Sequence, residues 1–197
     1  MDARASLVLA TRNAHKLAEF RRLLEPAGIA VQPLPDAIEL PPENGDTFAD
    51  NAIPKARCAA AATGLAALAD DSGIEAEALG GAPGVRSARY AGANASDAQN
   101  LDKLVREVSA GSPLRYVCAL AYVDPAAGLE RVFVGDCRGR LSGAPRGSRG
   151  FGYDPVFVPD ADGQRRTMAE LTDREKDAIS HRGNAARALI EWLNGHA

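Results

Sequence analysis

The chain has 197 residues, of which 46% are hydrophobic and 25% are charged, and its formal net charge is -3. This length and apolar content suit one domain over residues 1–197, or two closely packed lobes, and exclude a disordered chain. The acidic balance argues against a nucleic-acid partner, because such proteins carry a basic surface that neutralises phosphates. A small anionic ligand is compatible with this charge, because it needs only a few cations.

Cysteine usage and hydropathy bound the cellular setting. Cys58, Cys118 and Cys137 are odd in number and widely spaced, so they indicate neither a disulfide framework nor a zinc site. No segment approaches the length that spans a membrane, and the first residues do not resemble a targeting signal. We therefore expect a cytoplasmic protein with no membrane partner.

The first predicted unit is a strand, a turn and a helix. Residues 7–10 form a short apolar run, and apolar residues recur at helical spacing over 17–24. The turn between them, Thr11–Lys16, is rich in donors where a helix N-terminus presents unpaired N–H groups. These donors could hold a triphosphate. Taken alone, however, the turn is better explained as an ordinary strand-to-helix connection.

A second strand and a second helix follow. Residues 29–31 predict the strand, and residues 33–44 form a proline-rich, acidic loop. A helix over 47–63 can be capped by its first residue, a threonine. Pro54 lies inside this helix, where it removes a donor and clashes with the preceding turn. It predicts either a kink or a helix that starts nearer Ile53.

The rest of the chain alternates strand and helix patterns. In chain order they are a strand over 65–69, a helix over 97–108, strands over 114–123 and 129–138, a strand over 156–158, and a helix over 184–193. The second and third of these strands are separated by a turn sequence and predict an antiparallel hairpin. Thr172 and Glu175 fit a capping box, which predicts another helix start. Together these elements predict an α/β fold with a mixed sheet.

An acidic cluster is the first candidate for chemistry. Glu43 lies in the proline-rich loop, and Asp70 and Asp71 follow a predicted buried strand. Carboxylates suit magnesium, which prefers oxygen ligands, and a positioned carboxylate can activate water. The alternative is that the two aspartates cap a turn with Ser72 and Gly73, which is the commoner outcome for such a pair.

A glycine-flanked aromatic ring is the second candidate. Gly150 and Gly152 flank Phe151 and leave its ring face accessible, as a base-stacking platform requires. A glycine-rich turn that enters the strand over 156–158 explains the same residues equally well.

A group of donors near the C-terminus is the third candidate. Lys176, His181 and Arg182 could bind phosphate or a carbonyl edge. Each could equally be a solvated surface charge, which is the usual fate of such residues.

Six segments in a fixed order resemble the inosine triphosphate pyrophosphatase family, also called XTP/dITP diphosphatases. The resemblance spans nearly the whole chain. It is carried by Leu9–Lys16, Glu43–Phe48, Ala69–Gly73, Gly80–Gly84 with Ser87–Tyr90, Gly150–Pro155 and Ser180–Gly183. Each segment alone is weakly specific, whereas the six in order are highly specific. Arg12 and His15 fill variable positions of the first motif.

The resemblance implies a role for each matching residue. The implied substrate contacts are Thr11, Arg12, Asn13, Ala14, His15, Lys16, Ser72, Phe151, Gly152, Tyr153, Asp154, Lys176, His181 and Arg182. Asn13 and Lys16 would lie on the phosphates, and His181 with Arg182 would recognise the 6-oxo group of the purine. The implied magnesium ligands are Glu43 and Asp71. Asp71 is also the implied general base, with Asp70 supporting it and Lys16 stabilising charge.

The same resemblance implies a fold and a reaction, and two alternative functions compete with it. The fold would be an elongated mixed β-sheet with flanking helices, in two lobes around a central nucleotide-binding cleft, usually as a homodimer. The reaction would convert ITP, dITP or XTP to the nucleoside monophosphate and pyrophosphate. One alternative is a phosphatase that releases inorganic phosphate, as the adjacent aspartates could indicate. The other is a nucleotide-binding module without turnover.

Overall fold

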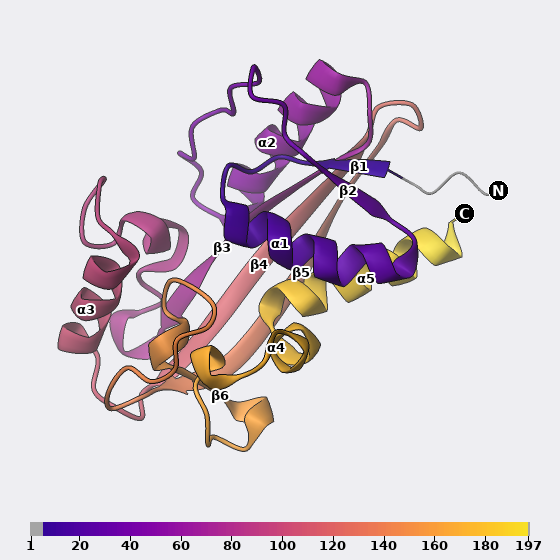
Figure 1. Cartoon of the computed structure of the whole chain (residues 1–197). Coiled ribbons are helices and arrows are strands. Elements are labelled where there is room, and N and C mark those ends of the chain that lie inside the picture. Colours follow the sequence, from indigo (N-terminus) through magenta and orange to yellow (C-terminus); the bar gives the residue numbers. More distant parts are fainter. Residues whose placement is uncertain (1–5, 197) are drawn as a thin grey trace. The chain divides into compact units, whose positions relative to one another are not determined.

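The computed structural model describes residues 6–196, so residues 1–5, where we expect no targeting signal, and residue 197 lie outside it. The strands and helices in chain order are β1 Ser6–Leu9, α1 Ala14–Leu24, β2 Ala30–Pro33, α2 Phe48–Thr63, β3 Ala67–Ala76, α3 Asp97–Glu107, β4 Pro113–Asp124, β5 Leu129–Leu141, β6 Phe157–Pro159, α4 Asp173–Ile179 and α5 His181–Gly195 (Figure 1). Short 3-10 turns connect several of them. Within residues 6–196, no helix combines the length and the apolar character that crossing a membrane requires.

The strands form a mixed sheet in the order β2-β1-β3-β4-β5-β6. β1 pairs in parallel with both β2 and β3, and β5 pairs antiparallel with β6. β4 and β5 are neighbours joined by four residues, too few for the crossover that parallel strands need, so they form the predicted hairpin. The α/β fold with a mixed sheet and flanking helices is therefore confirmed.

The chain divides into two compact units. Unit 1 comprises the residues up to Asp71, Cys118–Gly135 and the residues from Arg182 onward, and unit 2 comprises Ser72–Val117 and Asp136–His181. Strands β3, β4 and β5 each pass from one unit to the other along the chain. The predicted organisation in two lobes corresponds to these units.

Unit 1 has helices on both faces of its strands, and strand periodicity explains why. Alternate side chains of a strand point to opposite faces, so Leu7 and Leu9 of β1 pack with α1 and α5, whereas Val8 packs with α2. Phe20 and Leu24 fill the α1 side with Ala186 and Leu189 of α5. The α2 side is lined mainly by alanines, Ala52, Ala56, Ala59 and Ala60, which allow the helix backbone to approach the sheet closely.

Unit 2 has its own core around the remaining halves of the same strands. Leu101 and Leu104 of α3 pack in one cluster with Ile74 of β3 and with Tyr116 of β4. Phe157 of β6 is fully buried in this cluster. The candidate residues of unit 2 therefore lie next to a packed core of aromatic and aliphatic side chains.

Three sequence expectations about element ends were wrong. β3 does not end before the aspartates but continues through Asp70 and Asp71 to Ala76, because both carboxylates find polar partners inside the fold. α5 begins at His181, so His181 and Arg182 lie in its first turn and not in a connection between helices. α2 begins at Phe48, where Thr47 and Asp50 form a capping box, so the alternative of a start nearer Ile53 is wrong, and the kink at Pro54 stays a prediction.

Candidate active site

The turn Thr11–Lys16 is a helix N-terminus stabilised by its own side chains. Asn13 is the N-cap of α1, and its Oδ1 accepts hydrogen bonds from the N–H groups of His15, at 2.9 Å, and Lys16, at 3.1 Å. Thr11 Oγ1 accepts from Asn13 N at 3.1 Å. Ala14, His15 and Lys16 therefore belong to the first turn of α1, and the cap fixes the direction in which their side chains leave the backbone.

Arg12 lies in the same turn but is directed at the proline-rich loop. Its guanidinium donates to the carbonyl oxygens of Leu34 at 2.9 Å, Pro35 at 2.9 Å and Ile38 at 2.7 Å. Since a guanidinium has five N–H donors, it can hold several carbonyls of one loop at once. In this structure, Arg12 anchors the segment that leads to Glu43.

Asp70 is the centre of a buried ionic cluster in unit 1. Its carboxylate pairs with Lys16 Nζ through Oδ1, and Oδ2 lies 3.4 Å from Arg182 Nε and accepts from Cys118 Sγ at 3.1 Å. Arg182 also donates through Nη1 to Glu19 at 3.1 Å. Burial opposes ionisation of Asp70, but Lys16 and Arg182 outweigh it and lower its pKa well below the ordinary value. Asp70 therefore carries a fixed negative charge that holds two cations.

Asp71 occupies a different environment although it is the next residue. Its Oδ2 accepts from Asn51 Nδ2 at 2.9 Å, and its side chain is buried. Burial raises the pKa of Asp71, and nearby Glu43 raises it further, against the opposing effects of Lys55 and Asn51. A carboxylate with a raised pKa accepts a proton more readily than an ordinary one. Asp71 thus suits the role of a general base better than Asp70 does.

Lys55 connects the Glu43 side chain with the backbone of β3 at Asp70. Its Nζ donates to Glu43 Oε1 at 2.5 Å and to the carbonyl oxygen of Asp70 at 2.8 Å. The proline-rich loop that carries Glu43 is fastened to α2 because Gly45 N donates to Asn51 Oδ1 at 2.7 Å. A Cβ on Gly45 would lie 2.5 Å from Asp50 Cβ, so this close approach requires glycine.

The donor set of this region fits magnesium. Glu43 and Asp71 offer carboxylate oxygens, the hard ligands that magnesium prefers, and they are close enough for Glu43 to influence the pKa of Asp71. Within residues 6–196 no group of three or more His, Cys, Asp or Glu side chains forms a complete metal site. Magnesium usually takes one or two carboxylates and completes its coordination with water and substrate phosphates, so two carboxylates are sufficient.

Asp154 organises the candidate residues of unit 2. Its Oδ2 accepts from Lys176 Nζ at 2.7 Å and from Phe151 N at 3.0 Å, and its Oδ1 accepts from Tyr116 Oη at 3.2 Å. Asp154 and Lys176 are almost fully buried, which strengthens this ion pair relative to one in water. Gly150 has φ of +72°, and a Cβ there would lie 2.0 Å from Asp154 Oδ2, so the turn needs glycine.

The segment around Phe151 presents a ring and fixes its neighbours. The Phe151 ring is half-buried, and Lys176 Nζ lies 5.2 Å from its centroid. Gly152 N donates to Asp97 Oδ2 at 3.0 Å. The Tyr153 hydroxyl donates to the carbonyl of Ser87 at 2.7 Å, and its side chain is buried, so this residue packs into the core of unit 2. Phe151 is therefore partly exposed, as base stacking on its ring requires.

The remaining predicted residues of unit 2 are Ser72 and His181. Ser72 is half-buried within β3. The His181 ring is buried and stacks on Tyr116, with centroids 4.6 Å apart and planes 8° from parallel. His181 belongs to unit 2 and Arg182 to unit 1, although they are adjacent in sequence.

The structure therefore sorts the predicted residues into two groups with different chemistry. In unit 1, Asp70 contacts Lys16 and Arg182. In the same unit, Lys55 donates to Glu43, and Asn51 donates to Asp71. That group can bind charged phosphates and activate water. Phe151, Asp154 and Lys176 meet in unit 2 and offer an aromatic face beside a fixed ion pair, which suits a flat, polar base.

Several residues that hold the candidate side chains in place were not predicted from the sequence. Asn51 and Lys55 are four residues apart on α2, a spacing that places them on one face of the helix, and this was a usable signal. Tyr116 and Cys118 lie two residues apart within the apolar run of β4, so from sequence they resemble core residues. Only their partners, which come from distant segments, reveal them.

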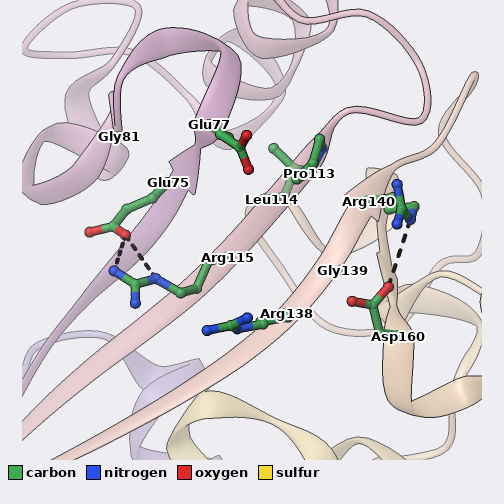
Figure 2. Close-up of a pocket in the computed structure, with 10 residues that line it drawn as sticks. All are labelled: Glu75, Glu77, Gly81, Pro113, Leu114, Arg115, Arg138, Gly139, Arg140 and Asp160. Atoms are coloured by element: carbon green, nitrogen blue, oxygen red, sulfur yellow. Dashed lines mark hydrogen bonds and ion pairs between the residues drawn. The ribbon is translucent and has the colours of Figure 1, made fainter.

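A separate cavity lies in unit 2, and none of the predicted site residues lines it. Its volume is about 390 Å³, and Figure 2 shows Arg115, Arg138 and Arg140 among its lining residues. Arg115 donates to Glu75 Oε2 at 3.0 and 2.6 Å, and Arg140 lies 3.9 Å from Asp160. Arg138 and Glu77 complete the charged lining, so three arginines and three carboxylates leave it with no net charge. It is not the candidate nucleotide site.

Known proteins resemble this chain over nearly its full length. A protein of Frankia alni named dITP/XTP pyrophosphatase is 52% identical, over 95% of this chain and 96% of that protein. A solved structure of a Ham1 protein from Coxiella burnetii is 41% identical with a TM-score of 0.85, covering 96% of this chain and 98% of the other. A solved dITP/XTP pyrophosphatase from Mycobacterium abscessus is 44% identical with a TM-score of 0.71, covering 93% and 98%. The family model described as the Ham1 family matches residues 7–192, and the chain belongs to that family.

Proposed function

We propose that this chain hydrolyses the non-canonical purine nucleoside triphosphates dITP, XTP and ITP to the nucleoside monophosphate and pyrophosphate. The observation that carries the proposal is the pair Asp70 and Asp71, in which buried Asp70 contacts Lys16 and Arg182 while the neighbouring Asp71 carboxylate is held by Asn51. Relatives of nearly equal length that are 52% and 47% identical and are named dITP/XTP pyrophosphatase support the same assignment.

In this proposal Asp71 is the base that activates water. Water attacks the α-phosphorus, the bond to the bridging oxygen breaks, and pyrophosphate leaves. Asp71 accepts the proton of the attacking water. The raised pKa of Asp71 favours this step, and Asn51 holds the carboxylate in place by donating to Oδ2 at 2.9 Å.

The cations of unit 1 stabilise the charge of the triphosphate. Lys16 projects from the first turn of α1, where the helix dipole also favours an anion. Asp70 keeps Lys16 in one orientation, so little reorganisation is needed when charge develops. Magnesium, which Glu43 and Asp71 would hold, supplies further positive charge at the phosphoryl oxygens when bound.

Unit 2 recognises the base in this proposal. Phe151 stacks on the purine ring, and Asp154 holds Lys176 beside the Phe151 ring. His181 binds the 6-oxo group, which is an acceptor where adenine carries an amino donor. A mismatched base would leave buried donors unpaired, and this penalty can produce strong discrimination. The homodimer and the cytoplasmic location stay predictions.

Product analysis tests the proposal. The protein is incubated with magnesium and, separately, dITP, XTP, ITP, ATP or GTP, and pyrophosphate is resolved from inorganic phosphate. We expect pyrophosphate as the primary product and turnover of the oxo purines well above that of ATP. Inorganic phosphate as the primary product would instead establish a phosphatase. Binding of ITP without any hydrolysis would indicate a nucleotide-binding module.

A further inference from the structure

Tyr116 of β4 contacts two of the candidate base-recognition residues of unit 2, His181 and Asp154. Its ring stacks on His181, with centroids 4.6 Å apart and planes 8° from parallel, and its hydroxyl donates to Asp154 Oδ1 at 3.2 Å. The opposite oxygen of Asp154 accepts from Lys176 and from Phe151 N. One side chain therefore connects the histidine with the lysine and the aromatic turn.

The surroundings of Tyr116 hold it in one orientation. The residue is 6% exposed, and its ring lies 4.5 Å from the ring of Phe157, which is fully buried in the core of unit 2. Its neighbours confine a core aromatic side chain to one rotamer. Tyr116 therefore restricts the orientation of the two side chains that it contacts, His181 and Asp154. Strand β4 thus provides a fixed plane against which the His181 ring lies flat.

We propose that Tyr116 is a positioning residue for base recognition: its ring orients His181, which sets base selectivity, and its hydroxyl orients Asp154, which sets the affinity for the base through Lys176. The proposal rests on the proposed function, in which His181 recognises the 6-oxo group. A hydrogen bond to that group requires the imidazole to lie at a defined angle, and the parallel stack fixes the plane of the ring. The hydroxyl fixes the Asp154 carboxylate and so the ammonium of Lys176.

Two substitutions separate the ring from the hydroxyl. Tyr116→Phe keeps the stack on His181 and removes the hydrogen bond to Asp154. We expect KM for dITP to rise by roughly 2- to 10-fold, the effect of one hydrogen bond, with kcat and the preference for dITP over dATP nearly unchanged. Tyr116→Leu removes both contacts. We expect KM to rise by about 5- to 100-fold and the preference for dITP over dATP to fall.

Tyr122→Phe is a matched control. Tyr122 lies on the same strand, is 5% exposed, and donates to Asp124 Oδ2 at 3.2 Å, so the substitution removes an equivalent hydrogen bond in unit 1. We expect KM and selectivity to stay at the wild-type values. A general weakening of the fold would affect both phenylalanine variants alike, whereas a positioning role affects Tyr116→Phe alone.

Nuclear magnetic resonance tests the stacking without turnover. The chain has three histidines, and His181→Gln assigns the signal of His181. A ring stacked at 4.6 Å shifts the imidazole protons upfield, so we expect that shift in the wild type and in Tyr116→Phe and its loss in Tyr116→Leu. The same spectra show whether Tyr116→Leu is folded.

The outcomes distinguish this proposal from the proposed function. Wild-type protein that releases no pyrophosphate from any oxo purine would overturn the proposed function and this inference with it. Active wild-type protein with unchanged KM in Tyr116→Phe and unchanged selectivity in a folded Tyr116→Leu would overturn the inference alone. The role of Tyr116 is also refuted if Tyr122→Phe raises KM as much as Tyr116→Phe does.

Discussion

The candidate residues of the two units differ in how their charges are arranged. In unit 1, buried Asp70 contacts Lys16 and Arg182, and Arg182 also pairs with Glu19, so four charges are interlocked. In unit 2, one ion pair, Asp154 with Lys176, lies beside the aromatic residues of the site. Interlocked charges suit the binding and cleavage of an anion, whereas a single pair beside flat rings suits recognition of a base.

This difference predicts a kinetic separation. Interactions that strengthen only in the transition state change kcat, whereas interactions made equally with bound substrate change KM. Substitutions among the acidic residues of unit 1 should therefore act mainly on kcat. Substitutions in the aromatic turn of unit 2 should act mainly on KM and on the choice of base.

The largest expected effect is that of Asp71→Asn. The amide cannot accept the proton of water, so kcat should fall by roughly 10²- to 10⁴-fold, the usual contribution of a general base. The change is nearly isosteric, and the amide oxygen can still accept the hydrogen bond from Asn51. Steady-state kinetics with dITP measures the effect, and Asp102→Asn, at an exposed position of α3, is the control. A wild-type kcat in the Asp71 variant would remove Asp71 from catalysis.

The next effect concerns stability and tests the interlocked charges. Asp70→Asn leaves Lys16 and Arg182 buried without the carboxylate that balances them, and removal of one partner of a buried pair costs about 3 to 5 kcal/mol. Denaturant unfolding at neutral pH measures this loss, with Asp102→Asn as the reference. A loss below about 1 kcal/mol, typical of a surface pair, would contradict the buried cluster.

The same variant gives a pH dependence with a defined sign. The pKa of Asp70 is lowered in the folded state, so its contribution to stability is present above the ordinary aspartate pKa of about 3.9 and is lost as pH falls below that value. The difference in unfolding free energy between wild type and Asp70→Asn should therefore shrink as the pH is lowered below about 4. A constant difference over that range would show that the charge of Asp70 is not the source of its effect.

A smaller effect is expected in unit 2. Phe151→Ala removes the proposed stacking surface, and stacking of one base on an aromatic ring contributes about 1 to 3 kcal/mol. KM for dITP should rise by about 5- to 150-fold, with a much smaller change in kcat. Phe133→Ala is the matched control, because Phe133 is also half-buried and packs on Trp192 in unit 1. A fall in kcat without a change in KM would erase the distinction between the units.

Local sequence signals predicted most of the fold. Thr47 with Asp50, and Thr172 with Glu175, form the capping interactions that their spacing indicates, and these interactions lie within four residues of chain. The hairpin of β4 and β5 was predictable for the same reason. Where the partners are near in sequence, composition and spacing are sufficient.

Long-range pairing explains what the sequence could not predict. A strand that continues through Asp70 and Asp71 violates the usual pattern, and it is stable because Lys16, Arg182 and Asn51 arrive from three other elements. Tyr116 likewise has the pattern of a core residue until His181 is placed against it. The residues of the candidate site could be named from motif order, but which of them contact one another could not.

The smallest expected effect tests whether unit 1 depends on the backbone of α2. Pro54 is exposed inside this helix and lies between Asn51 and Lys55, which contact the acidic residues. Pro54→Ala restores an N–H that can donate within the helix, which stabilises the folded state. The substitution also makes the unfolded chain more flexible, which offsets part of that gain, so the unfolding free energy should rise by about 1 to 2 kcal/mol. Because Asn51 and Lys55 are each held by side-chain contacts, kcat and KM should stay within about twofold of wild type. A large fall in kcat in a stabilised variant would show that the proline shapes the helix so that these two residues reach the carboxylates.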